Sequence, residues 1–369
     1  MQDENAAKLL AHVMNWGNDL AGVSEVLHPL QLLADYKYDH YQRFAPGRRF
    51  IESLALWIDQ FDQADREHAL SFVRNKLVFF SEEEMSHLVG TAYPDLIVQE
   101  RMRLVAEESD LGLHRVVEIS NHTRFTDLRI KSLYLGLSDG ARTNELRRAS
   151  DGEISNEQIW QAYELGEEKA EDMIGELKKA LLKIGKEVNH PLFNIIWLLD
   201  DFSGSGNTYI RFDSKSKSFK GKIPKIYDRL TKGDLVDQQH YEVFLLLYVA
   251  TRQAIDHIEY WTERYTSEKG YKPLQVRVLC VIEPEDSLKN SPDIGVAALL
   301  SNEKYNDAQA ADEHFRKGGT EDPKMGFAGC ALPLVLSHNT PNNSVFVLWG
   351  PEQSKFFGLF PRVSRHREF

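Results

Sequence analysis

Cysteine is scarce in this sequence: Cys280 and Cys330 are the only two among 369 residues. Two cysteines supply neither a disulfide framework nor a cysteine-rich zinc site, so we expect a reducing, cytoplasmic environment. Long hydrophobic runs are also missing, because the longest, Val243 to Ala250, is far too short to cross a membrane. The first residues, MQDENAAK, lack the features of a secretory leader.

Basic residues are outnumbered, with 44 Lys and Arg against 56 Asp and Glu and a formal net charge of -12. This balance argues against wholesale wrapping of nucleic acid, although local basic patches can still bind phosphate. Several catalytic motifs are absent too. The glycines are not followed by a Walker lysine, and the sequence has no HExxH, paired cysteine or GxSxG motif, which argues against P-loop ATPases and the common zinc and serine hydrolases.

What is present indicates a globular chain, with 42% hydrophobic and 27% charged residues. Residues 1–110 are predicted to form a helical N-terminal domain. In FIESLALWIDQFD the large apolar residues recur at helical spacing, namely Phe50, Leu54, Trp57, Ile58 and Phe61. Ser81 and Glu84 have the spacing of a capping box. A nucleic-acid contact is the alternative interpretation of this domain, through Arg43, Arg48 and Arg49.

Residues 111–369 are predicted to form an α/β domain with a mostly parallel sheet. Apolar runs typical of strands alternate here with helical segments, the runs being RVVEIS, SLYLGLS, NIIWLLDD, EVFLLLYVA and LQVRVLCVIE. A crossover helix is predicted between SLYLGLS and NIIWLLDD, beginning at a capping box from Ser155 to Gln158, with a break at Gly166. Two short strands, ALPLVLS and SVFVLWG, are predicted around the loop HNTPNN.

Asp200 and Asp201 end a run that suits a strand buried on both faces, at the edge where ligands of open α/β sheets gather. The next residues offer two flexible glycines and three hydroxyls, namely Gly204, Gly206, Ser203, Ser205 and Thr208. Such a loop, with the N-terminus of a following helix, suits a phosphate. Two carboxylates repel phosphate but match a diol or magnesium. The combination describes a ribose 5-phosphate.

The segment DDFSGSGNT resembles the phosphoribosyl-diphosphate motif of type I phosphoribosyltransferases, which are glycosyltransferases. By that resemblance Asp200 and Asp201 hold the ribose hydroxyls, with magnesium bound through the substrate. The 5-phosphate would be cradled by Ser203, Gly204, Ser205, Gly206, Asn207 and Thr208. Gly204 stands where many members have Thr or Ser, and Asn207 where many have Gly, so one side-chain contact to phosphate is expected to be lost.

A second loop, LGLSDGAR, ends a strand one crossover before the acid pair, where type I enzymes place a diphosphate-binding loop. We assign Ser138, Asp139 and Gly140 to substrate binding, and Arg142 to neutralising the leaving diphosphate. An ordinary turn is the alternative for SDGA. Arg147 and Arg148, in NELRRAS, are further candidates for leaving-group charge, with surface salt bridges as the alternative.

From about residue 45 to its end the chain also resembles a branch of phosphoribosyltransferase-like proteins from bacterial conflict and anti-phage loci, the PRTase-CE-like proteins. The resemblance is carried by LGLSDGAR, ISNEQIW, LLDDFSGSGNT, GFAGCALPLVLSHNTPNNSVFVLW and LFPR. It implies a defence role, sometimes beside a retron reverse transcriptase or another partner protein. This resemblance does not specify the substrate.

Two other segments are candidates for binding. HNTPNN could read a base edge or bind a partner through His338, Asn339, Asn342 and Asn343, and an Asn-rich turn is the alternative. A basic arm runs from Arg211 to Lys232 between the phosphate loop and the next strand. It could close over a diphosphate or touch nucleic acid, or it could be a solvated loop.

Two rival functions use the same residues. DNA methyltransferases carry a similar loop, Asp-Pro-Phe followed by Gly-Ser-Gly, for S-adenosylmethionine. Here Asp201 replaces the proline, and no Asp-Pro-Pro-Tyr or Pro-Cys motif appears. A protein that binds a nucleotide or partner without turnover is the other alternative. We therefore predict a phosphoribosyltransferase, or a relative that cleaves a nucleotide glycosidic bond. A module that binds a nucleotide or partner without turnover is the alternative.

Overall fold

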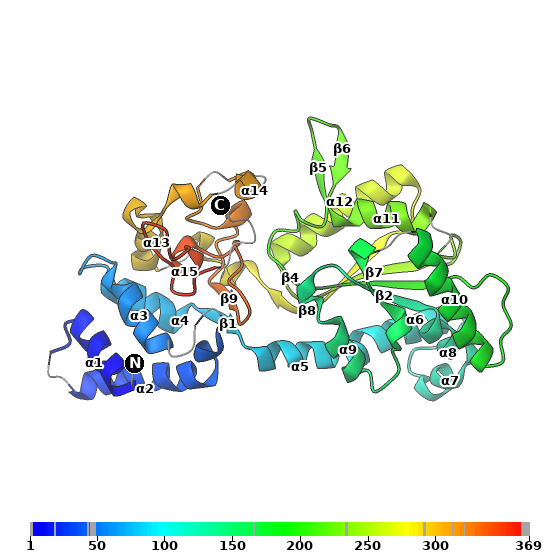
Figure 1. The fold of residues 1–369 in the computed structure, drawn as a ribbon, viewed down its shortest axis with the longest axis horizontal. Coiled ribbons are helices and arrows are strands. Elements are labelled where there is room, and N and C mark those ends of the chain that lie inside the picture. Colours follow the sequence, from blue (N-terminus) through cyan, green and yellow to red (C-terminus); the bar gives the residue numbers. More distant parts are fainter. Residues whose placement is uncertain are drawn as a thin grey trace. The chain divides into compact units, whose positions relative to one another are not determined.

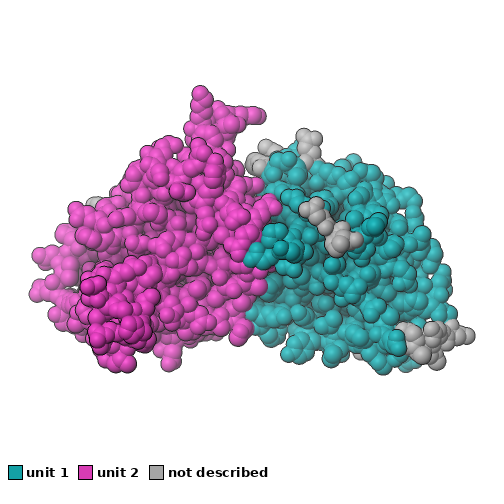
Figure 2. Space-filling view, turned by 180° about the vertical axis from the view of Figure 1, so that it is seen from behind, with its two compact units in different colours: residues 1–85, 283–369 teal, residues 86–282 magenta. Residues whose placement is uncertain are grey.

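The computed structural model describes residues 3–17, 20–42, 44, 49–164, 167–232, 235–290, 293–311, 313–316, 318–320 and 322–362. The chain divides into two compact units (Figure 2). The first unit joins Met1–Met85 to Glu283–Phe369, and the second comprises Ser86–Ile282. Among the described residues, no helix has the length and apolar character needed to cross a membrane.

The second unit contains a five-stranded parallel sheet in the order β3-β2-β4-β7-β8. In that order its strands are Ile159–Gln161, Ser132–Gly136, Ile195–Ser203, Glu242–Thr251 and Leu274–Ile282. The predicted α/β class with a mostly parallel sheet is confirmed. Four strands correspond to apolar runs identified in the sequence. The fifth, β3, was not predicted, because it is three residues long and carries no apolar run.

Helices cover both faces of this sheet (Figure 1). The second unit contains most of α5 and all of α6 to α12, whose bounds are Glu82–Ala92, Val98–Glu108, Val116–Asn121, Thr123–Ile130, Thr143–Ala149, Glu167–Lys183, Lys222–Lys232 and Arg252–Lys269. A π-helical turn, Tyr93–Ile97, joins α5 to α6. The crossover helices α10, α11 and α12 share a buried core with alternate strand residues, such as Leu198 and Leu245.

The opposite face of the sheet carries Trp197 and Phe244, whose rings stack with centroids 4.4 Å apart. Helix α6 lies over this face, where its Glu100 forms an ion pair with Arg277 of β8. Successive side chains of a strand point to opposite faces. Two neighbouring residues of β4 therefore meet different helices, and this rule separates the two acids at its end.

The first unit is mostly helical and contains a short parallel pair of strands, β1 with β9. Its helices α1 to α4 and α13 to α15 span Asp3–Val13, Leu20–Tyr36, Phe50–Asp59, Arg66–Asn75, Ile294–Ser301, Glu313–Arg316 and Phe346–Trp349. The strands are Val78–Phe80 and Leu334–Leu336. The helical pattern predicted from FIESLALWIDQFD is confirmed, since Phe50, Leu54, Trp57, Ile58 and Phe61 are all buried. Arg43 and Arg48 lie outside the described residues.

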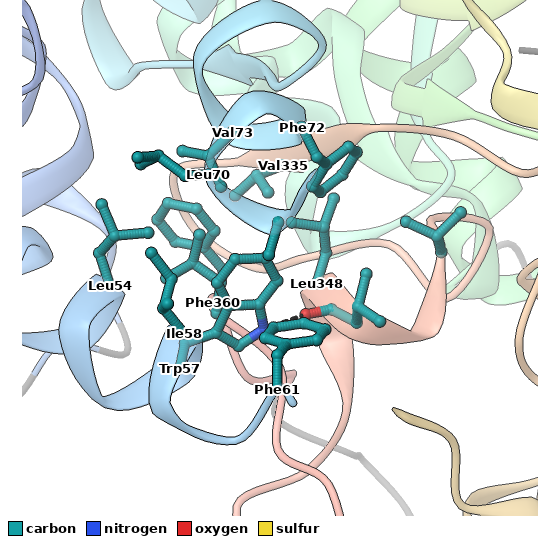
Figure 3. Close-up of a cluster of buried hydrophobic side chains, with 14 of the residues drawn as sticks. Leu54, Trp57, Ile58, Phe61, Leu70, Phe72, Val73, Val335, Leu348 and Phe360 are labelled. Atoms are coloured by element: carbon teal, nitrogen blue, oxygen red, sulfur yellow. Dashed lines mark hydrogen bonds between the residues drawn. The ribbon is translucent and has the colours of Figure 1, made fainter. Parts of the chain in front are cut away.

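The two units differ from the expected domains 1–110 and 111–369. The C-terminal segment from Glu283 folds with the N-terminal helices, and residues 86–110 belong to the unit of the sheet. The physical reason is pairing between distant segments. Strand β9 hydrogen-bonds to β1, and the Trp57 indole donates to the Val347 carbonyl at 2.8 Å (Figure 3). Local periodicity carries no information about such long-range partners.

Two predicted strands are helices. RVVEIS forms most of α7, in which Ile119 is buried while Val116 and Val117 are more than half exposed. SVFVLWG contains α15, a single turn with all four residues buried. The β-branched residues of RVVEIS, and the β-branched and aromatic residues of SVFVLWG, favoured a strand, but tertiary packing decided otherwise. A short apolar run that is buried on every side cannot be assigned from periodicity alone.

Both predicted capping boxes form. The Ser81 amide donates to the Glu84 carboxylate at 2.8 Å, and the Glu84 amide donates to the Ser81 hydroxyl at 3.1 Å. The box from Ser155 to Gln158 caps a 3-10 turn that leads into β3, so it does not start the crossover helix, which begins at Glu167. Gly166, the predicted break, lies outside the described residues.

Replacing Trp57 with Ala should destabilise the first unit, because it removes both the bond to Val347 and a fully buried ring in contact with Phe61. We expect a loss of about 3–5 kcal/mol in the free energy of unfolding, or a melting temperature lower by on the order of 10 °C. The matched control is Leu56→Ala on the exposed side of the same helix, with an expected change within about 0.5 kcal/mol. Equal melting temperatures for the two variants would contradict this assignment.

Candidate functional site

The loops that follow β2 and β4 meet at the carboxyl edge of the sheet. These strands are parallel neighbours, with Gly136 in register with Leu199, so both loops leave the sheet at the same end. The Ser138 hydroxyl donates to one carboxylate oxygen of Asp200. Gly140 lies so close to Asp201 that an added Cβ would be 2.5 Å from the carboxylate. The structure thus brings together the two loops singled out in the sequence.

Asp200 points to the face of the sheet covered by α11 and is almost fully buried, with 3% of its surface exposed. Its second carboxylate oxygen accepts from the Tyr209 hydroxyl at 2.8 Å and from the Lys222 ammonium at 2.9 Å. Together with the bond from Ser138, both oxygens are engaged by protein donors. Burial raises the pKa of Asp200, and the positive charge of Lys222 acts in the opposite direction.

Tyr209 is fully enclosed beside this carboxylate. Burial, followed by the negative charge of Asp200, raises the pKa of the Tyr209 phenol well above its usual range. The phenol therefore stays protonated and acts as a donor to Asp200. Lys222 is the more accessible partner, because 29% of its side chain is exposed. Of the groups around Asp200, Lys222 is the one whose flexible stem allows it to move.

Asp201 points to the opposite face and is half-buried. It lies between the register pairs Asp200–Leu247 and Phe202–Val249, which places it opposite Tyr248. The Tyr248 hydroxyl donates to the Ala141 carbonyl at 3.1 Å.

Charged groups near Tyr248 change the pKa of its phenol. Burial raises the pKa of the Tyr248 phenol most, followed by the negative charge of Glu145, while Arg142 lowers it and the two acids raise it further. Arg142 stands at the start of α9 with left-handed backbone angles, and its guanidinium binds Glu145 at 3.0 Å. The pair of Arg142 and Glu145 thus follows directly after the loop whose Gly140 lies against Asp201.

The serine and glycine loop packs onto the first turn of α12. Ser203 to Gly206 are buried, Asn207 is half-buried and Thr208 is exposed. Gly206 has φ 76°, and an added Cβ would lie 2.8 Å from the His257 ring and 2.9 Å from the Ala254 carbonyl. The Thr251 hydroxyl, which caps α12, also donates to the Gly204 carbonyl at 2.7 Å. Only the distal residues of the loop face outward.

The expected helix directly after this loop is not there. A turn and a β-hairpin follow instead, formed by β5 (Arg211–Asp213) and β6 (Ser218–Lys220), and α11 begins after them. The first amides of α11 are already used, since the Lys222 amide donates to Thr208 at 3.1 Å and the Ile223 amide donates to Tyr209 at 3.0 Å. Gly221 permits this approach, because a Cβ there would be 2.3 Å from the Tyr209 carbonyl.

The remaining candidates of the second unit lie on and before α9. Asp139 and Gly140 belong to a 3-10 turn capped by Ser138, whose hydroxyl accepts from the Gly140 amide at 3.1 Å. Arg148 is exposed, and Arg147 is half-buried. The Nε atom of Arg147 is buried without a hydrogen-bond partner among the described residues. Such an orphaned donor is unusual in a folded protein.

The four candidates in HNTPNN belong to the first unit, whereas the acid pair belongs to the second. Asn343 is buried, and its side-chain amide donates to the Phe327 carbonyl at 3.3 Å. The Asn342 carbonyl accepts from the Phe327 amide at 2.6 Å. The Asn339 backbone amide donates to the Leu336 carbonyl and closes a turn that contains His338. Asn342 and Asn343 thus fix the loop around Phe327 within their own unit, which agrees with the alternative of an Asn-rich turn.

No local sequence pattern predicts a role for Tyr209 or Tyr248, and Lys222 is predicted only as part of the basic arm from Arg211 to Lys232. Tyr209 directly follows the motif DDFSGSGNT. This position is the one local signal that points to Tyr209. Lys222 reaches Asp200 only because the hairpin returns the chain to the end of β4. Tyr248 is one of several apolar residues of β7, and its place beside Asp201 depends on strand register.

Comparisons with known proteins agree with this arrangement at the level of a family. Residues 54–362 match the PRTase-CE family, and the match covers more than half of the chain, including both loops of the site. A search of curated proteins gave no significant match, and neither did a search of solved structures. On this evidence the chain belongs to the PRTase-CE family and is phosphoribosyltransferase-like.

Proposed function

We propose that this protein binds phosphoribosyl diphosphate, or a related ribose 5-phosphate nucleotide, at the carboxyl edge of β2 and β4. The observation that carries the proposal is the meeting of Ser138 with Asp200, and of Gly140 with Asp201, in a member of a phosphoribosyltransferase-like family. Ligands of open parallel sheets gather at this edge. The site provides acids for a diol and cations for phosphates within one unit.

The two acids have different roles in this proposal. Asp201 is half-buried and would accept hydrogen bonds from the ribose hydroxyls. Asp200 would fix the loops through Ser138 and Tyr209, and it would turn to the sugar only when Lys222 leaves it. A phosphate group attracts the Lys222 ammonium, whose side chain is 29% exposed, so ligand binding itself would favour this release.

The phosphates would be held by donors from both loops. Asn207 and Thr208 are the outward-facing part of the serine and glycine loop, and the buried residues before them hold it in position. On the other side, Arg142 would contact the diphosphate by exchanging its bond to Glu145. Arg147, with its orphaned Nε, and the exposed Arg148 would add positive charge for the leaving group.

Magnesium fits this site only together with the substrate. The described residues contain no cluster of three or more His, Cys, Asp or Glu side chains that could hold a metal ion. Magnesium is commonly bound by one or two carboxylates and substrate phosphates, which suits Asp201 better than Asp200 beside Lys222. When bound, it would neutralise charge on the diphosphate.

The proposed reaction is transfer at the ribose anomeric carbon. The bond from this carbon to the diphosphate oxygen breaks, the diphosphate leaves with the electron pair, and a nucleophile forms the new bond. Arg142 would stabilise the charge of the leaving group, and Asp201 would hold the ribose in place. Hydrolysis of a nucleotide glycosidic bond is the corresponding reaction with water as nucleophile.

Binding without turnover is the second candidate function. It is favoured by the enclosure of Asp200, whose two oxygens both accept from protein groups. In that case the protein would sense a nucleotide in the cytoplasm or bind a partner. For either function we propose a role in bacterial anti-phage defence, with a partner such as a retron reverse transcriptase complex, on the basis of the family resemblance.

A thermal-shift titration tests the proposal. Phosphoribosyl diphosphate with magnesium should raise the melting temperature by roughly 5–10 °C at about one hundred times the dissociation constant. Asp200 and Asp201 replaced together by Asn should remove this shift while the far-UV circular dichroism spectrum stays the same. S-adenosylmethionine serves as the comparison ligand. A shift with S-adenosylmethionine alone, or an unchanged shift in the double variant, would refute the assignment.

Release of diphosphate separates the two candidate functions. A transferase or glycosidic hydrolase should release diphosphate or free base from the bound ligand, and the double Asn variant should not. A ligand that raises the melting temperature but remains intact after long incubation would identify the binding module.

Gly140→Ala should weaken ligand binding with little effect on folding. The added Cβ would be 2.5 Å from the Asp201 carboxylate, which would have to move away from its position. Loss of a charge-assisted hydrogen bond corresponds to an affinity reduced about tenfold to a hundredfold. Gly175→Ala in α10 is the control, because a Cβ there has no neighbour within 4 Å. Equal affinities of the two variants for phosphoribosyl diphosphate would argue against a role of Asp201.

A further inference from the structure

The hairpin of β5 and β6 stands out from the body of the second unit (Figure 1). The chain turns back through Lys217, which has a left-handed φ of 49°. The Asp213 carboxylate accepts the Lys215 and Ser216 amides at 2.9 and 3.2 Å and so stabilises the turn. The hairpin is therefore a defined structure and not the solvated loop that the sequence allowed.

One face of the hairpin is aromatic. Phe212 and Phe219 are directly opposite each other in the register. Phe212 stacks on Trp261 of α12, with centroids 5.9 Å apart and an angle of 7° between the rings. Tyr260 lies edge-on to Trp261 at 5.0 Å, and Arg264 lies over both of these rings. These contacts join the hairpin to α12 as one aromatic surface.

Part of this aromatic surface is open to solvent. Phe212 is 40% exposed and Tyr260 is 50% exposed, although both rings make aromatic contacts inside the cluster. His257, Trp261 and Arg264 follow one another at helical spacing along the stripe that faces the hairpin, with Tyr260 at its edge. Phe219 and Trp261, the rings that contact them, are half-buried. Exposed flat rings held in place by such neighbours are a platform on which other planar groups can stack.

The charge of the hairpin is opposite to that of the chain. Residues 211–220, which form the hairpin, contain four Lys and Arg against one Asp, whereas the whole chain has a net charge of -12. Lys215, Lys217 and Lys220 have exposed side chains on the hairpin itself. A local reversal of charge on a projecting element indicates an anionic partner. Helix α12 also has four exposed acids: Asp256, Glu259 and Glu263 lie beyond Tyr260, and Glu268 follows Arg264 along the stripe. These acids limit the surface on both of those sides.

We propose that this surface binds single-stranded nucleic acid, with bases stacked on Phe212 and Tyr260 and phosphates held by Lys215, Lys217 and Lys220. Lysines alone would fit any polyanion, but exposed rings beside them suit unpaired bases, whose faces are accessible only in single strands. The surface does not use the acid pair or its loops. Its binding is therefore independent of the proposed ribose phosphate site.

Fluorescence anisotropy tests the proposal without phosphoribosyl diphosphate or magnesium. The probes are labelled thymidine and uridine oligonucleotides, each about 20 nucleotides long, which exceeds the site size of typical single-strand-binding domains. The full chain should bind at least one of them at about 50 mM salt with a micromolar dissociation constant, and more weakly at about 200 mM. The stronger probe identifies DNA or RNA as the partner.

The variants separate phosphate contacts from stacking. Lys215, Lys217 and Lys220 replaced by Ala should reduce the slope of log affinity against log salt by about 2. A matched control replaces three exposed lysines of α10, Lys169, Lys179 and Lys183, and should bind like the unmodified protein. Tyr260→Ala should weaken binding about tenfold with the salt slope unchanged, as expected for lost stacking. All variants should keep their melting temperature, because the replaced residues are exposed.

Three results would overturn the proposal. The first is no binding of either oligonucleotide at low salt, including a case in which anionic lipid vesicles bind instead. The second is equal binding by the hairpin variant and the α10 control. The third is competition by a duplex as strong as that by the single strand, because this would show that the phosphates alone are recognised and the rings are not.

Discussion

The arrangement of the site depends on the buried carboxylate of Asp200. It accepts from Ser138 after β2, from Tyr209 after the serine and glycine loop, and from Lys222 at the start of α11. Three segments that are separate in the sequence are therefore fixed to one point at the carboxyl edge of the sheet. A buried charge is costly unless it is paired and hydrogen-bonded, so these three donors offset the cost of burying this carboxylate.

Strand geometry divides the acid pair that looks uniform in the sequence. Asp200 points to the side of α11 and is enclosed, while Asp201 points to the side of α9 and stays half-buried beside Gly140. Of the two adjacent acids, Asp200 is thus structural and Asp201 is accessible. The family relationship is consistent with a site for a phosphorylated ribose, and this division indicates which acid would contact it first.

The segment between β4 and β7 contains two distinct features. Its base supplies Tyr209 and Lys222 to the acid pair, and its tip forms the basic and aromatic hairpin. Gly221, with φ 129° and no room for a Cβ beside Tyr209, lets the chain return from the hairpin to the sheet. One segment therefore contributes to both surfaces through different residues, and each surface has its own ligand chemistry.

The sequence by itself determined the parallel sheet and the edge at which the candidate site lies. Long apolar runs such as that before Asp200 are buried on both faces, and parallel strands must bring their following loops to the same edge. Tertiary structure decided the rest. It made helices of the apolar runs around Val116 and Phe346, joined the C-terminal segment to the N-terminal helices, and enclosed Asp200 behind Lys222. Periodicity reports only which face of a segment is apolar, whereas these outcomes depend on partners that are distant in the sequence.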